Sequence, residues 1–82
     1  MIFLIEYDRL KGHIVTMVAF EDFDRSKAEN SRLQVELDLH RRKLDHEVVL
    51  LEAASEEALR RTHRRYFEDL SQIMKSVSVG TD

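Results

Sequence analysis

The chain lacks cysteine and proline entirely, and it contains only two glycines among 82 residues. Without cysteine there is no disulfide, no thiolate metal site and no cysteine nucleophile. Because small secreted domains are usually disulfide-rich, this absence favours a reducing compartment, and we expect a cytoplasmic protein. Two glycines are also too few for a glycine-rich loop that binds phosphate.

Long hydrophobic runs are missing as well. The apolar start, residues 1–5, is followed at once by Glu6 and Asp8, so it does not resemble a signal peptide. No stretch approaches the roughly 18 apolar residues of a spanning helix, and we expect no membrane association. Hydrophobic residues make up 43% of the chain and charged residues 35%, which is typical of a folded domain. The net charge of −3 argues against general nucleic-acid binding.

The hydrophobic pattern predicts one domain of order ββαβα over residues 1–75, followed by a flexible tail at 76–82. Residues 2–9 and 14–21 favour strands, and the turn between them contains Gly12, which can take a positive φ. Residues 46–53 predict a third strand, and Ser55 is the expected N-cap of a second helix. That helix should turn one apolar stripe to the sheet: Leu59, Thr62, Tyr66, Leu70, Ile73 and Val77, flanked by Phe67 and Met74.

Two signals disagree between residues 25 and 42. The residue types favour a helix, but the apolar residues at 33, 35, 37 and 39 alternate with polar ones as in a strand. We interpret the segment as a helix, because it is far longer than an ordinary strand, while a strand over 33–39 stays open as the alternative. On a helix the apolar side chains fall on two faces, Leu33, Leu37 and Leu44 on one and Ala28, Val35 and Leu39 on the other.

The expected fold is α+β in two layers, a three-stranded mixed sheet with two helices. The strand at 14–21, the helix and the strand at 46–53 form a βαβ unit, so these strands should run in the same direction. The first strand is expected in the centre, antiparallel to both. All three strands and the first helix carry apolar residues on two faces, more than one short chain can cover. We therefore expect a homodimer, with Val35, Leu39, Leu33 and Leu37 as interface candidates.

Four arginines between residues 60 and 65 are the most concentrated charge in the chain. On a helix each has an acidic residue one turn away, as in Glu56–Arg60 and Arg64–Glu68. We interpret this surface as ion-paired and exposed to solvent. Weak binding of nucleic acid through it is an alternative.

Five residues are weak functional candidates: His63, Tyr66, Tyr7, Asp8 and Arg9. The alternative hypothesis is a small-ligand-binding or catalytic dimer, in which His63 and Tyr66 meet Glu52 or Asp8 in a pocket between subunits. The other histidines have no metal-ligand spacing. We predict no catalytic, cofactor or metal site.

These residues do not name a biochemical activity. The favoured hypothesis is a small non-enzymatic interaction or accessory domain that acts as a homodimer and has a protein partner.

Overall fold

The computed structural model describes residues 1–68. The tail predicted at 76–82 lies outside them, and so do Leu70, Ile73, Met74 and Val77 of the predicted second helix. The elements in chain order are β1 (Ile2–Asp8), β2 (His13–Phe20), the 3-10 turn η1 (Asp22–Asp24), α1 (Arg25–Arg42), β3 (His46–Glu52), α2 (Glu56–Thr62) and the 3-10 turn η2 (Arg64–Tyr66). The small α+β fold and the ββαβα order are confirmed.

The strand order is β2-β1-β3, with β1 in the centre and antiparallel to both neighbours. β2 and β3 therefore run in the same direction, as expected for two strands joined through a helix. Because β1 lies between them, no parallel pair forms, and the sheet expected to be mixed is antiparallel throughout.

The β1–β2 hairpin turns at Gly12, whose φ of 70° lies in the region that favours glycine. The backbone N–H of Gly12 donates to the carbonyl of Asp8 at 2.7 Å, and the Asp8 carboxylate accepts from the backbone N–H of Lys11 at 3.0 Å. The register shifts by one residue beyond the turn, because Tyr7 faces Ile14 whereas Glu6 faces Thr16. Val15 is thus the extra residue of a β-bulge on β2.

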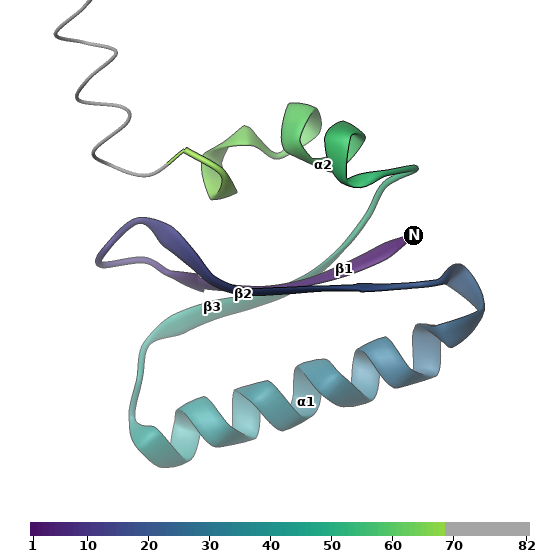
Figure 1. Cartoon of the computed structure of the whole chain (residues 1–82). Helices are drawn as coiled ribbons and strands as arrows, with labels where there is room; N and C mark the ends of the chain where they lie inside the picture. The colour runs from purple at the N-terminus through teal and green to yellow at the C-terminus, as the bar shows by residue number, and fades with distance from the viewer. Residues whose placement is uncertain (69–82) are drawn as a thin grey trace, which may run out of the picture.

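The two helices cover opposite faces of the sheet (Figure 1). Phe3 and Ile5 of β1 form a buried cluster with Leu59 of α2 and Tyr66 of η2. The alternate β1 residues, Ile2 and Leu4, are also buried, and they point to the face that α1 covers. The central strand is consequently apolar on both sides, which explains its continuous hydrophobic run.

Residues 25–42 form a helix, so helix propensity prevails over the alternating pattern. The two expected faces of α1 are present. Ala28 and Leu39 are 0% and 4% exposed, whereas Leu33 and Leu37 are 50% and 49% exposed. The helix ends where Lys43 takes a left-handed conformation, so Leu44 lies beyond it.

The second helix is much shorter than the sequence predicts. Its N-cap is confirmed, because the Ser55 hydroxyl accepts the backbone N–H of Ala58 at 3.1 Å. It ends at Thr62, and His63 leaves helical geometry with φ −125° and ψ 52°. The chain then forms η2, which places the Tyr66 hydroxyl on Glu47 of β3. A tertiary contact therefore overrides the helical periodicity that predicted a longer helix.

Candidate functional site

Two tyrosines from distant parts of the sequence meet on the α2 face of the sheet. Tyr7 comes from the end of β1 and Tyr66 from η2, and their ring centres lie 5.2 Å apart in an edge-to-face arrangement. The Arg65 guanidinium stacks over the Tyr66 ring, 4.1 Å from its centre. Two of the five candidates thus lie in one aromatic cluster, which packs η2 onto the sheet.

Glu47 is the polar centre of this cluster, and sequence reasoning missed it. Its carboxylate accepts hydrogen bonds from the Tyr66 hydroxyl and from Arg65, the latter at 2.8 Å. The Arg9 Nε lies 3.5 Å from the other carboxylate oxygen. Glu47 lies directly opposite Tyr7 in the β1–β3 register. No sequence pattern connects the two residues, and only this register brings them together. A register between two strands so far apart in sequence is a tertiary property.

The titration of this cluster follows from its contacts. The hydrogen bond from Tyr66 and the neighbouring Arg65 lower the pKa of Glu47, so the carboxylate stays charged. Burial, followed by the adjacent Glu47 charge, raises the pKa of Tyr66 to about 12. The phenol therefore keeps its proton and acts as a donor. Such a pair suits an anchor between elements better than a tyrosinate nucleophile or base.

Asp8 lies on the opposite face of the sheet and has a different partner. His46 of β3 is placed between two β1 carboxylates, with Nδ1 2.6 Å from Glu6 and Nε2 3.5 Å from Asp8. The backbone hydrogen bond from Lys11 lowers the pKa of Asp8, and the nearby His46 acts in the same direction. Both ring nitrogens of His46 face carboxylates of the chain itself. This arrangement cross-links the ends of β1 and β3.

Within one chain, the residues predicted to line a pocket between subunits lie apart from one another. The His63 ring lies beside its neighbour, with Nδ1 2.9 Å from the Thr62 hydroxyl. Glu52, at the far end of β3, forms an ion pair with Arg25 at the start of α1. Tyr66 and Asp8 belong to the two separate clusters described above. The structure brings Tyr7, Tyr66 and Arg9 together around Glu47, but it places His63, Asp8 and Glu52 elsewhere.

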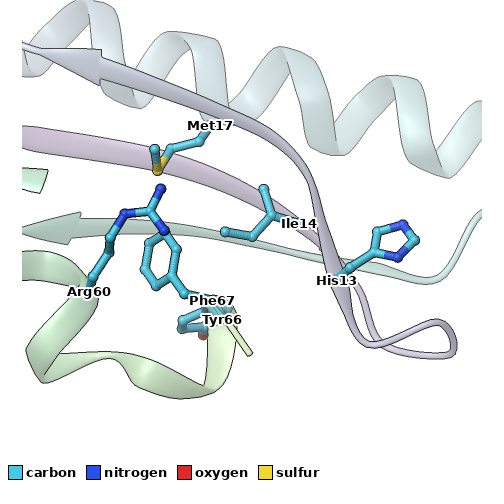
Figure 2. A pocket seen from close by; sticks show the side chains of 6 residues that line it. All are labelled: His13, Ile14, Met17, Arg60, Tyr66 and Phe67. Atoms are coloured by element: carbon cyan, nitrogen blue, oxygen red, sulfur yellow. The ribbon is translucent and has the colours of Figure 1, made fainter. Parts of the chain in front are cut away.

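A shallow pocket of about 260 Å³ lies between β2 and the α2–η2 segment. Figure 2 shows its lining, with Arg60 beside Phe67 and Met17, and with His13 set apart near the hairpin. The Arg60 guanidinium lies 4.6 Å from the centre of the Phe67 ring and pairs with Glu56 at 3.1 Å. The walls are otherwise mainly apolar, and the volume is small for an organic ligand. The charged group of this pocket is already engaged within the chain.

Three of the four arginines at residues 60–65 are ion-paired, and among the described residues the expected Glu57–Arg61 pair does not form. The expected pairs Glu56–Arg60 and Arg64–Glu68 are present at 3.1 and 2.8 Å. Arg65 pairs with Glu47, because η2 turns it to the sheet, whereas its expected partner Asp69 lies outside the described residues. Acidic side chains therefore compensate much of the positive charge that a phosphate backbone would need.

The four interface candidates separate into two groups. Leu39 is buried beneath α1 within the chain itself, and Val35 is partly buried on the same face. Leu33 and Leu37 are half exposed on the other face. Only the second pair offers a large apolar surface to another molecule.

Within residues 1–68, no helix is both long and apolar enough to cross a membrane. The same residues contain no group of three or more His, Cys, Asp or Glu side chains arranged to hold a metal ion. Neither a family model, nor a curated protein, nor a solved structure matches this chain.

Proposed function

We propose that this chain is a small, non-enzymatic interaction domain that acts as a homodimer through the outer face of α1. The observation that carries the proposal is the pair Leu33 and Leu37, which are 50% and 49% exposed although α1 already covers its own sheet with the other face. A helix that is apolar on two sides is stable when both sides are covered. The absence of cysteine supports a cytoplasmic setting.

The spacing along this face suits another helix. Asn30, Leu33, Leu37 and His40 follow one another at intervals of three, four and three residues, which is the spacing of a helix–helix seam. In an antiparallel pair about a two-fold axis, Leu33 of each copy packs beside Leu37 of the other. Two leucines in the centre and polar residues at both ends make a short, self-complementary seam.

The polar clusters support a structural role rather than a catalytic one. Glu47 receives hydrogen bonds from Tyr66 and Arg65, and His46 lies between Glu6 and Asp8. These side chains hold strands and turns to one another. A protein partner, if the dimer serves as an accessory domain, would bind the assembled dimer.

The test is the double substitution Leu33→Gln and Leu37→Gln, measured by sedimentation velocity over a range of concentrations. Both side chains point away from the core, so the circular dichroism spectrum and the free energy of unfolding should remain close to those of the wild type. We expect dimer formation through α1 to be lost. Ala54→Gln, an exposed apolar-to-polar change in the β3–α2 connection, is the matched control and should leave association intact.

The proposal fails if the double variant associates as strongly as the wild type. Substitutions at Val35 or Leu39 are less informative, since those residues lie on the face that packs against the sheet. A glutamate there would disturb the fold as well as any assembly.

A further inference from the structure

β2 is an edge strand that lacks the features that usually prevent such a strand from pairing with another chain. It lies at one margin of the sheet, and none of its eight residues is an acidic residue, a lysine, an arginine or a proline. Five of the eight are exposed, among them Val15 and Val18. Charges and prolines are the usual devices that prevent an edge strand from pairing with another chain. The bulge at Val15 disturbs only the end near the hairpin, and Thr16–Phe20 keeps a regular register.

The opposite edge, β3, is built differently. α1 packs over β3 and β1 much more than over β2, and only the last residue of β3 is exposed. β3 also carries Glu47 near its start and Glu52 at its end. Charged side chains of this kind protect an edge strand from pairing with another chain. The two edges of one sheet therefore differ in whether they can accept a second copy.

The charges that flank β2 indicate which partner it fits. Lys11 precedes the strand, whereas Glu21 and Asp22 follow it. When two copies of β2 lie antiparallel about a two-fold axis, Lys11 of each copy lies near Glu21 and Asp22 of the other. Lys11 and Glu21 are both exposed, and Asp22 already pairs with the N-terminal amine of its own chain at 2.9 Å. A parallel arrangement would instead bring like charges together.

We propose that β2 is a second self-association surface, to which the β2 strand of another copy adds antiparallel. The contact joins two three-stranded sheets into one continuous sheet, with both α1 helices on the same face. New backbone hydrogen bonds form between the strands, and Val15 and Val18 gain cross-strand neighbours. The inference rests on β2 alone, because the outer stripe of α1 points away from the sheet and stays open in this arrangement.

Charge reversal provides the sharpest test. Lys11→Glu places an acidic side chain near the partner's Glu21 and Asp22, and two such contacts occur in each pair. We expect the β2-dependent association constant to fall about tenfold. Glu21→Lys should weaken it in the same way, and the double variant Lys11→Glu/Glu21→Lys should restore much of the loss. Recovery in the double variant is not expected if either change merely damaged the fold.

A second variant tests the strand itself. Val18→Lys introduces onto the edge strand a charge of the kind that prevents pairing with another chain, whereas Val18→Thr keeps β propensity without charge and serves as the matched control. We expect Val18→Lys to weaken the association about tenfold or more and Val18→Thr to leave it nearly unchanged. Hydrogen exchange gives an independent readout, since amides of Thr16–Phe20 should gain protection with rising wild-type concentration but not in Val18→Lys.

These outcomes are separable from those of the α1 proposal. If both surfaces act, Leu33→Gln/Leu37→Gln leaves a dimer joined through β2, Val18→Lys leaves one joined through α1, and the combination is a monomer. The β2 inference is overturned if Val18→Lys and Lys11→Glu both associate like the wild type. In that case a loss of association in the leucine variant alone would leave the α1 proposal standing.

Discussion

On one face of the sheet, α1 provides a regular helix of 18 residues, whereas on the other α2 and η2 provide segments of seven and three. The long helix contacts the sheet through small and aliphatic residues such as Ala28 and Leu39, and its outer face remains apolar. The short segment uses Leu59 and Tyr66, and Glu47 of the sheet binds the Tyr66 hydroxyl. The α1 layer is held mainly by apolar packing, with the exposed ion pair Arg25–Glu52 at its start, and it also has exposed apolar residues on its outer face.

This difference indicates how a chain of 82 residues can both stabilise its own fold and leave a surface for contact with another molecule. A polar anchor fixes a short segment that has too few apolar residues to hold itself by burial. A long helix can be held mainly by its buried face, and its second face is then open to contact with another molecule. The stabilising contacts of α1 and its proposed association surface lie on opposite sides of the same helix.

The largest expected effects come from removing one aliphatic core residue from each layer. Leu39→Ala and Leu59→Ala each delete a side chain that is at most 4% exposed, and each should lower the free energy of unfolding by about 2–5 kcal/mol. Chemical denaturation with circular dichroism measures both. The exposed Leu33→Ala is the matched control and should change the stability of the monomer by less than about 0.5 kcal/mol. A small loss at Leu39 would mean that α1 does not depend on its inner face.

The anchor of the α2 layer predicts an alkaline effect of intermediate size. The pKa of Tyr66 is raised from 10.0 to about 12, so the folded state holds the phenolic proton more tightly than the unfolded chain does. This contribution to stability is complete below pH 10 and is lost as the pH rises from 10 to about 12. Tyr66→Phe should cost about 1–2 kcal/mol at neutral pH and remove this part of the pH dependence.

Tyr7→Phe is the control for that measurement. The Tyr7 hydroxyl lies 3.4 Å from the backbone carbonyl of Arg65 and does not touch the carboxylate. Its alkaline profile should therefore follow that of the wild type. Equal profiles for all three proteins between pH 10 and 12 would contradict the role of the Tyr66–Glu47 pair.

The smallest of these stability effects is expected at the start of α2. Ser55→Ala removes the side-chain acceptor for the backbone N–H of Ala58 and should cost about 1 kcal/mol. Ser55→Asn keeps an oxygen acceptor and should recover most of it. The start of α1 differs, because Asp24 makes no capping hydrogen bond through its side chain. Asp24→Ala should accordingly cost less than Ser55→Ala in the same thermal-unfolding experiment.

The features that the sequence predicted well are those set by neighbouring residues. The hairpin at Gly12, the cap at Ser55 and the two faces of α1 follow from local conformation and helical spacing. The central position of β1 followed from its apolar residues on both sides, which only a strand buried on both faces can cover.

The features that escaped prediction depend on the assembled sheet. Helical periodicity extends past residue 62, but α2 ends there and η2 brings the Tyr66 hydroxyl onto Glu47. Glu47 and His46 look like ordinary polar residues of a strand start until the register places them beside Tyr7 and Asp8. Leu44 was grouped with Leu33 and Leu37, but the left-handed Lys43 ends the helix before it. Register and helix termination are decided by tertiary contacts.

Sedimentation equilibrium of the wild-type chain from low micromolar to high micromolar concentration tests the central claim of self-association most directly. We expect the apparent mass to rise with concentration above the 9.7 kDa of one chain, reaching at least twice that value. A folded species that stays at 9.7 kDa over the whole range would contradict both the dimer formed through α1 and the pairing of β2.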